Sequence, residues 1–431
     1  MAPRIAYYGD DFTGATDTLA TATQGGLRTL LFLRVPTADQ LAAAGDLDCV
    51  GIAGASRSMA PAAMQDELRP VAACLEKLGA PVTHYKTCST FDSAPEVGNI
   101  AVAARVLSDA IPGRILPIVG GQPNIGRYCV FGHLFAAAEA GGPPLRIDRH
   151  PMANHPVTPM TESDLRLHLA RQGMKNVRPV FFPAYEGRPE PLEHATGPEA
   201  KGPLLFDVTR PSDLAPIGRT IWQEARQRRL VALGPSGVTQ ALCAHWHDSG
   251  EVMAPDAAPR IGAAQGPVLV MAGSLSPVTR AQIAAATDFA RVPVDAARFA
   301  ADDPDHIAAL VATIVSHLGA GHSVIAHTTP LDGAAPEAPA DNRIARATGA
   351  FLARLMSIVK LRRLGIAGGD TSSWTLRALD IWGLSFAGHL SPGVALCRAH
   401  SANRKLDGLD VMLKGGQMGP LDLFQRLRDG N

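Results

Sequence analysis

Short apolar runs alternate along the chain with longer segments of helical spacing, and the turns between them are rich in glycine, serine and aspartate. An apolar run of four to eight residues bounded by such turns indicates a buried strand. Apolar residues three and four positions apart, as between Pro61 and Leu78, indicate an amphipathic helix. Because strands that alternate with helices favour parallel pairing with right-handed crossovers, we predict an α/β fold with mainly parallel sheets flanked by helices.

The pattern predicts the main elements by position. The strands expected from apolar runs cover residues 5–8, 27–33, 48–53, 82–86, 115–119, 177–182, 204–208, 230–233, 268–272, 363–367 and 411–413. The clearest helices are expected from about residue 13 to the Gly25-Gly26 pair, over 61–78, 97–110 and 217–228, and from Thr161 onward. Asp164 would then complete a capping box three residues after Thr161.

One stretch has no periodicity at all. From about His247 to Gly266 the sequence is rich in alanine, proline and glycine, which is typical of a connection between domains. We therefore predict an N-terminal domain over residues 1–248, a linker over 249–266 and a C-terminal domain over 267–431. The active site is expected in the cleft between the two domains.

Composition excludes several classes of protein. The 431 residues carry 40 basic and 40 acidic side chains, so nothing favours nucleic acid or an anionic membrane as a partner. No apolar run approaches the roughly 20 residues that span a bilayer, and the N-terminus shows no signal pattern. The six cysteines are scattered without a C-x-x-C pair, which indicates reduced thiols in the cytoplasm. Cys88 is accordingly expected to be a packed thiol.

The turn after the first strand carries two adjacent carboxylates, Asp10 and Asp11. Ligands of open α/β sheets bind beyond the carboxyl ends of the strands, where this turn is expected. One aspartate is explained as the N-cap of the following helix, but a cap needs only one. Either carboxylate is a candidate general base, or a ligand for substrate hydroxyls or Mg²⁺, and the sequence leaves open which aspartate has which role.

Further polar side chains follow the other strands of the first domain. Arginine and lysine suit a carboxylate, and aspartate and asparagine suit hydroxyl groups, so the mixture favours a small polyhydroxylated anion. The predicted substrate-binding residues are Ser56, Arg57, Lys86, Ser89, Asp92, Asn99 and Arg127.

The second domain contains three similar turns between a strand and a helix, at residues 273–277, 368–373 and 414–419. Backbone amides and helix dipoles at such turns attract phosphate, and glycine allows close approach. Ser276 is expected to cap a helix that starts at Pro277. Asp370 is either an N-cap or a metal contact. The predicted nucleotide-binding residues are Ser274, Ser276, Gly368, Gly369, Asp370, Thr371, Lys414, Gly415 and Gly416.

These turns are not of the common nucleotide-binding kinds. The P-loop pattern G-x-x-x-x-G-K-[ST] is absent, and no G-x-G-x-x-G follows a strand. A phosphate-binding domain together with a domain for a polyhydroxylated acid nevertheless indicates phosphoryl transfer, which requires positioning and Mg²⁺.

Five motifs together resemble the four-carbon acid sugar kinases. They are Asp10-Asp-Phe-Thr-Gly-Ala-Thr-Asp17, Ser56-Arg57, Lys86-Thr-Cys-Ser-Thr-Phe-Asp-Ser93, Gly368-Gly-Asp-Thr371 and Lys414-Gly-Gly-Gln-Met-Gly419. The resemblance runs from residue 5 to about residue 425. It implies an N-terminal substrate domain, a C-terminal ATP domain and phosphorylation of threonate, erythronate or 3-oxo-tetronate. It also implies ATP contacts from Ser274, the 368–371 turn, Gly415 and Gly416.

Two departures from the family pattern bear on specificity. Many members have Asp-Ser-Thr-Leu-Arg-Gly-Asn after the fourth strand, whereas this chain has Asp92-Ser-Ala-Pro-Glu-Val-Gly-Asn99 and lacks the arginine. The last turn has Gln417-Met418 where Asn-Phe is usual.

The function predicted is an ATP-dependent kinase of a four-carbon sugar acid, with ATP and Mg²⁺ as cofactors. The alternatives are a lyase or dehydrogenase acting on a phosphorylated sugar acid, and a non-catalytic nucleotide sensor. The partners expected are the acid and ATP, and a homodimer is an assembly that the sequence leaves open.

Overall fold

The computed structural model describes most of the chain, in two compact units that cover residues 1–256 and 257–431. The described residues are 2–138, 141–155, 157–185, 192, 196–197, 199–255, 260–274, 276–328, 343–368, 375–376 and 378–430. Each unit has its own sheet and its own helices.

The first unit is built on a parallel sheet. Its strands lie in the order β2-β3-β1-β4-β11-β5-β10-β9, and each pairs with its neighbour in parallel. They are β1 (Ile5–Gly9), β2 (Thr29–Phe32), β3 (Cys49–Ala53), β4 (Val82–Lys86), β5 (Ile115–Val119), β9 (Arg178–Val180), β10 (Gly202–Phe206) and β11 (Leu230–Gly234).

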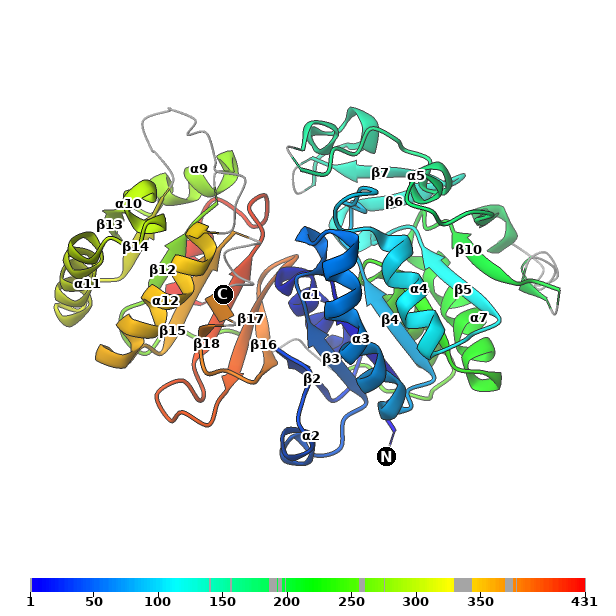
Figure 1. Ribbon diagram of the computed structural model, residues 1–431, viewed down its shortest axis with the longest axis horizontal. Helices are drawn as coiled ribbons and strands as arrows, with labels where there is room; N and C mark the ends of the chain where they lie inside the picture. Colours follow the sequence, from blue (N-terminus) through cyan, green and yellow to red (C-terminus); the bar gives the residue numbers. More distant parts are fainter. Residues whose placement is uncertain are drawn as a thin grey trace. The chain divides into compact units, whose positions relative to one another are not determined.

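Helices cover this sheet. They are α1 (Phe12–Gln24), α2 (Ala38–Ala44), α3 (Pro61–Leu78), α4 (Ile100–Ala110), α5 (Leu165–Arg171), α7 (Leu214–Gln227) and α8 (Gly237–Asp248). Helices α3 and α4 pack side by side and lie in front of the strands in Figure 1. Helix α8 packs against both α7 and α1. The apolar stripe of α3, which includes Leu68 and Leu75, is fully buried against the sheet.

A small antiparallel sheet follows β5 in the chain. It consists of β6 (Arg127–Val130), β7 (His133–Ala137) and β8 (Pro144–Arg146), in that order. Figure 1 shows β6 and β7 beyond the carboxyl ends of the parallel strands of this unit. This sheet therefore borders the edge at which ligands of α/β folds bind.

The second unit has a mixed sheet in the order β13-β14-β12-β15-β18-β17-β16. Its strands are β12 (Leu269–Ala272), β13 (Ala290–Pro293), β14 (Val324–His327), β15 (Arg363–Ala367), β16 (Gly383–Ser391), β17 (Val394–His400) and β18 (Asp410–Lys414). Its helices are α9 (Pro277–Ala285), α10 (Ala296–Ala300), α11 (Pro304–Gly319), α12 (Arg343–Ile358) and α14 (Leu423–Asp429). Figure 1 shows α12 in front of β12 and β15, and α14 packs against α9 and β15.

The predicted α/β class with mainly parallel sheets is confirmed, and some details are corrected. The helix expected from Thr161 begins at Leu165, because Asp164 is itself the N-cap and its carboxylate accepts from the Arg166 amide. The helix expected from residue 97 begins at Ile100 after the Asn99 cap. The antiparallel strands β16 and β17 were not predicted. The substrate-binding role of residues 1–248 and the nucleotide-binding role of residues 267–431 stay predictions.

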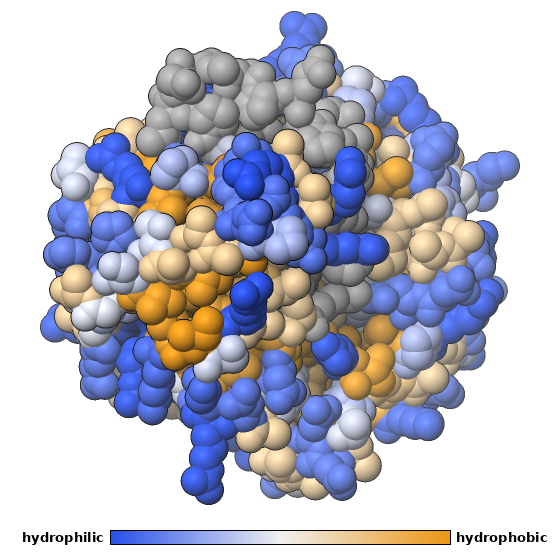
Figure 2. Space-filling view, turned by 60° about the vertical axis from the view of Figure 1, so that its left-hand side comes forward, coloured by the Kyte–Doolittle hydropathy of each residue, from blue (hydrophilic) through white to orange (hydrophobic). Residues whose placement is uncertain are grey.

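The face drawn in Figure 2 is mostly hydrophilic. Figure 2 shows charged and polar residues over much of one face, with apolar residues gathered in smaller groups between them. Among the described residues, no helix combines the length and the apolar character needed to cross a membrane.

Candidate active site

The turn after β1 places both predicted catalytic carboxylates at the carboxyl edge of the first sheet. Gly9 pairs with Ala53 of β3 on one side and with Lys86 of β4 on the other, so the turns after three strands emerge together. Asp11 is the N-cap of α1, and its Oδ1 accepts from the Gly14 amide at 2.8 Å. Asp10 is almost fully buried, and its own amide donates to the Lys86 carbonyl.

Arg57 joins the two carboxylates. Its Nε and Nη2 donate to the two oxygens of Asp10 at 3.1 and 2.7 Å, and Nη2 also donates to Asp11 Oδ1 at 2.8 Å. Burial lowers the pKa of Arg57, but the Asp10 and Asp11 carboxylates outweigh it, so the pKa lies well above its ordinary value. Burial raises the pKa of Asp10, although Arg57 opposes the shift.

The two aspartates therefore differ in whether a carboxylate oxygen remains available to a ligand. Both oxygens of Asp10 are occupied by Arg57. Asp11 uses Oδ1 for the helix cap and for Arg57, while its Oδ2 has no partner among the described residues. Asp11 is the carboxylate with an oxygen available to a ligand.

Lys86 lies beside this pair. A Cβ added to Gly14 would lie 2.5 Å from Asp11 Oδ1 and 2.7 Å from Lys86 Nζ, so only glycine fits between them. Lys86 is buried, and its Nζ donates to the Thr87 carbonyl at 2.7 Å. Its ammonium group thus lies close to the first turn of α1.

Three more predicted residues follow β4 and β5. Asp92 accepts from Thr90 Oγ1 at 2.6 Å. Arg127, at the start of β6, lies within electrostatic range of Asp92 and Cys88, and burial lowers the pKa of Arg127. Ser89 is half-buried in the turn after β4. Cys88 is half-buried, its Sγ lies 3.2 Å from Thr90 Oγ1, and burial raises its pKa to about 11.

Two predicted substrate residues serve the fold. Ser56 is fully buried, and its hydroxyl pairs with the Tyr85 hydroxyl at 3.0 Å. Asn99 caps α4 through Oδ1, and its Nδ2 donates to the carbonyls of Pro95 and Gln172. Neither donor of the Asn99 amide remains for a ligand, so the function proposed below does not rely on either residue.

In the second unit, Lys414 ends β18 and is completely buried. Its Nζ donates to Thr279 Oγ1 at 2.7 Å and to the Gly416 carbonyl at 3.0 Å. Among the described residues no carboxylate contacts it, and burial lowers its pKa to about 7.

Helix α9 holds the turn that follows Lys414. Thr279 Oγ1 donates to the Gly416 carbonyl at 3.0 Å. Gln282 Nε2 donates to the carbonyls of Met418, Gly419 and Pro420 at 2.9–3.1 Å. Among the described residues, the backbone amides of residues 415–417 donate to no acceptor. The contacts between this turn and α9 use the carbonyl groups of the turn. Free amides at a glycine turn are typical of an anion site.

The turn after β12 lies against the same segment. Ser276 is the N-cap of α9 and Pro277 is its first residue, as predicted. A Cβ on Gly416 would lie 2.6 Å from Ser274 Oγ and 3.1 Å from Ser276 Cβ. The amide of Gly368 donates to the Lys414 carbonyl at 2.9 Å, which joins the third turn to the other two. The predicted residues Gly369, Asp370 and Thr371 lie outside the described residues.

Both halves of the chain match family models. Residues 5–242 match a sugar-binding N-terminal domain, and residues 269–424 match a nucleotide-binding C-terminal domain. The chain is 39% identical to a 3-oxo-isoapionate kinase of Paraburkholderia graminis, over 99% of this chain and 94% of that kinase. The chain belongs to the four-carbon acid sugar kinase family.

Other relatives agree with membership of the kinase family. A 3-oxo-tetronate kinase of Methylobacterium radiotolerans is 30% identical over 100% of this chain and 99% of its own length. A solved structure described as a putative tRNA synthase from Salmonella typhimurium has a TM-score of 0.78 and 24% identity, with 98% of both chains covered. That likeness shows the fold alone.

The residues of α9 that support the 414–419 turn were not identified from the sequence. Thr279 and Gln282 are fully buried polar side chains three positions apart on α9. Polar residues on the buried face of a helix are the signal that would have identified them. Three or more His, Cys, Asp or Glu side chains do not gather into a metal site within the described part of the chain.

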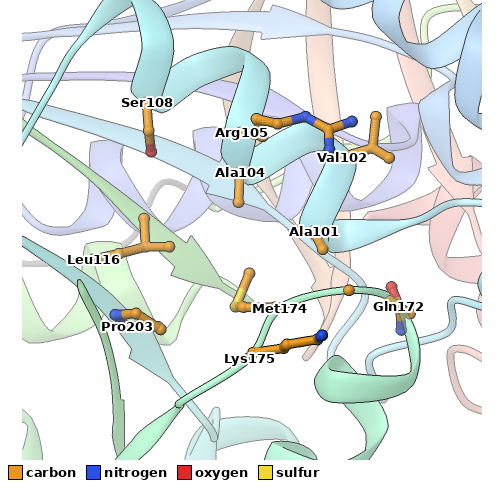
Figure 3. A pocket seen from close by; sticks show the side chains of 11 residues that line it. Ala101, Val102, Ala104, Arg105, Ser108, Leu116, Gln172, Met174, Lys175 and Pro203 are labelled. Atoms are coloured by element: carbon orange, nitrogen blue, oxygen red, sulfur yellow. The ribbon is translucent and has the colours of Figure 1, made fainter.

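A separate recess lies away from these turns. It has a volume of about 260 Å³, and Figure 3 shows Arg105 on α4 and Lys175 after α5 on opposite sides of it. Leu116 and Pro203 line it near the amino ends of β5 and β10. Since ligands of this fold bind at the carboxyl ends, the recess is not part of the candidate active site.

Proposed function

We propose that this chain is an ATP-dependent kinase that transfers the γ-phosphoryl group to a hydroxyl of a short sugar acid. The single observation that carries the proposal is the turn after β1, where Arg57 fixes two adjacent carboxylates and leaves Asp11 Oδ2 free. A hydroxyl nucleophile needs such an acceptor for its proton. The relatives that are named as sugar acid kinases support the assignment of this acceptor to a kinase reaction.

In this proposal Asp11 is the general base and Asp10 is a positioning residue. The attacking hydroxyl donates its hydrogen bond to Asp11 Oδ2 and loses its proton there as its bond to the γ-phosphorus forms. The bond between that phosphorus and the bridging oxygen breaks, and ADP leaves with the oxygen. Asp10 keeps Arg57 in place, and Arg57 in turn fixes Asp11 Oδ1. Lys86, Ser89, Asp92 and Arg127 bind the rest of the acid.

The second unit binds the nucleotide. The free amides of residues 415–417 and the hydroxyls of Ser274 and Ser276 donate to phosphate oxygens. The ammonium group of Lys414, which donates to the Gly416 carbonyl, compensates the negative charge of the phosphates. The predicted contacts from Gly368, Gly369, Asp370 and Thr371 complete this part of the proposal.

The described residues of the second unit could bind Mg²⁺ only together with the phosphates of the nucleotide. They offer hydroxyl and carbonyl oxygens at the turns, and Mg²⁺ commonly takes most of its ligands from phosphates and water. Asp370 is the proposed protein contact. When bound, Mg²⁺ neutralises charge that develops on the phosphates.

The proposed substrates are 3-oxo acids of the tetronate or isoapionate type. The names of both groups of relatives contain a 3-oxo acid, and the identity is higher to the 3-oxo-isoapionate kinase, at 39% against 30%. A homodimer stays a prediction, which light scattering on the purified protein tests.

A screen for ADP release tests the proposal. The purified chain is incubated with ATP and Mg²⁺ and with threonate, erythronate, 3-oxo-tetronate or 3-oxo-isoapionate. ADP release that depends on one of these acids is expected. In parallel, thermal shift is measured with ATP·Mg²⁺, NAD and each acid alone. Stabilisation by NAD but not by ATP would indicate a dehydrogenase, and ATP binding without acid-dependent turnover would indicate a nucleotide sensor.

A further inference from the structure

Gln122 follows β5, and its side-chain amide is completely buried. Its Nε2 donates to Asp17 Oδ2 at 2.9 Å, while its Oε1 is buried and accepts from no donor among the described residues. The amide cannot be reversed, because Oε1 would then face the Asp17 carboxylate. A buried acceptor without a donor costs free energy, so a donor on a bound ligand would stabilise this oxygen.

The orientation of Gln122 is fixed by a small network. Ser236, before α8, donates to Asp17 Oδ2 at 2.5 Å and pairs with Thr18 Oγ1 at 2.9 Å. Asp17 on α1 therefore joins the ends of β5 and β11. This network fixes the orientation of the Gln122 amide.

Arg127 is the complementary group. Its Nη1 donates to the carbonyls of Ile125 and Ala137 at 2.8 and 3.0 Å, which fixes the guanidinium. Its Nε is buried without a partner, and no carboxylate among the described residues forms an ion pair with it. A buried cation of this kind is stabilised by an anion, and a ligand can provide one.

The backbone brings these two residues together. Gln122 and Arg127 form an antiparallel bridge with hydrogen bonds of 2.9 and 3.3 Å in both directions. Residues opposite each other in such a bridge direct their side chains to the same face, with Cβ atoms about 5 Å apart. Thr83 Oγ1 and Trp246 Nε1 are also unpartnered among the described residues, but they do not lie at the carboxyl end of a strand. Thr13 Oγ1, in the first turn of α1, is a further unpartnered atom at this edge of the sheet.

We propose that Gln122 and Arg127 form a subsite for the 2-hydroxy-carboxylate head of the acid. Arg127 donates to the carboxylate, Gln122 Oε1 accepts from the adjacent hydroxyl, and Asp17 and Ser236 position the Gln122 amide. The inference rests on the proposed function and deepens it, because it explains how a chain without the usual arginine between Asp92 and Asn99 holds an acid. It also predicts that the hydroxyl next to the carboxylate is required for tight binding.

Calorimetric titration of the full chain without ATP tests this subsite independently of turnover. The probes are 2,3,4-trihydroxybutanoate as a mixture of stereoisomers, 3,4-dihydroxybutanoate, which lacks the 2-hydroxyl, and erythritol, which lacks the carboxylate. The wild type is expected to bind the trihydroxy acid about 10-fold more tightly than the deoxy acid. Erythritol is expected to bind at least about 10-fold more weakly than the trihydroxy acid.

Gln122→Met should abolish the preference for the 2-hydroxyl while leaving binding of the deoxy acid nearly unchanged. Arg127→Gln should weaken both acids by about 10- to 100-fold and leave erythritol unaffected. Asp17→Asn, which loosens the amide, should reduce the preference by a smaller factor. A general structural defect would weaken all probes alike, so the pattern across probes separates the roles.

Gln425→Met is the matched control. Gln425 on α14 also donates through Nε2, to the Ala285 carbonyl, and also has a buried Oε1 without a partner. Its substitution should leave the preference intact. If the wild type binds the acids but Gln122→Met keeps the preference, this inference is overturned and the proposed function stands. If the wild type binds none of the acids and releases no ADP with any acid of the screen, both are overturned.

Discussion

After β1, Arg57 lies between the carboxylates of Asp10 and Asp11, whereas after β18 Lys414 meets no carboxylate among the described residues. Arg57 lies in the short helical turn that follows β3, Lys414 is the last residue of β18, and both cations are largely buried. The first is compensated by the protein itself. The second donates only to a hydroxyl and to a backbone carbonyl.

This difference indicates different tasks for the two turns. A compensated guanidinium keeps the Asp11 oxygen in place before any substrate arrives, which suits a group that must accept a proton from a defined direction. An uncompensated ammonium group carries a desolvation cost that a bound phosphate relieves. The contrast therefore supports an acid site in the first unit and a nucleotide site in the second.

The largest expected effect comes from Asp11→Asn. The amide still accepts from Gly14 and Arg57 but cannot take up a proton, so kcat should fall by about 10²- to 10⁴-fold. Steady-state ADP release measures the loss, and titration with ATP should give a Kd within about twofold of the wild type. A large loss of ATP affinity would mean that the roles of the two units are reversed.

Arg57→Gln should be the most destabilising change at this turn. It leaves two neighbouring carboxylates buried without their cation, and breaking such a group typically costs about 3–5 kcal/mol. Urea unfolding measures the free energy. Arg69→Gln is the control, because Arg69 pairs with Asp66 on the exposed face of α3 and its loss should cost less than about 0.5 kcal/mol.

In the second unit, Gly416→Ala should weaken ATP binding by about 1–3 kcal/mol, since the added Cβ meets Ser274 Oγ at 2.6 Å and must displace the turn. Calorimetry with ATP·Mg²⁺ measures the change. Gly319→Ala, at the end of α11, adds a Cβ with no heavy atom within 4 Å and should have no effect. Equal ATP affinity in both variants would contradict a phosphate site at Gly416.

The last prediction is a pH dependence that originates in Lys414. Its folded pKa of about 7 lies below its ordinary value of 10.5, so the unfolded chain binds more protons between these values. Stability should therefore rise as the pH increases from about 7 toward 10, by less than about 1.4 kcal/mol per pH unit. ATP binding favours the charged lysine, so ATP affinity should fall over the same range.

Lys414→Met tests the sign of both slopes. The substitution removes the titrating group, so the contribution of Lys414 to both pH dependences should disappear. Denaturant unfolding and ATP titration at pH 7, 8 and 9 measure them. A wild type whose stability falls over this range while that of Lys414→Met does not would contradict the assignment.

Sequence reasoning was most accurate where local pattern determines structure. Helix α3 and strands β4, β5 and β15 have the bounds that the apolar pattern predicts, and the Ser276 cap was also predicted. The antiparallel strands β16 and β17 were missed, because glycine, serine and histidine residues interrupt the apolar pattern of β16. Their pairing is local, with Ser391 opposite Val394 across a tight turn.

The candidate site shows a second limit. The sequence identified Asp10, Asp11 and Arg57, but not the contacts that join them, and the assignment of Arg57 to the substrate stays a prediction. The contact between Arg57 and the carboxylates spans 47 residues and exists only because β1 pairs with β3. Gln122 was missed because its significance lies in an unsatisfied oxygen, which only the folded environment reveals.

The most direct measurement follows the phosphoryl group itself. ATP labelled at the γ-phosphate is incubated with the wild type, Mg²⁺ and either 3-oxo-tetronate or 3-oxo-isoapionate, and the products are separated by chromatography. The account predicts that the label moves to the acid, and that Asp11→Asn abolishes the transfer while still binding ATP. Label that stays in ATP with every acid tested, or that appears only as inorganic phosphate, would contradict it.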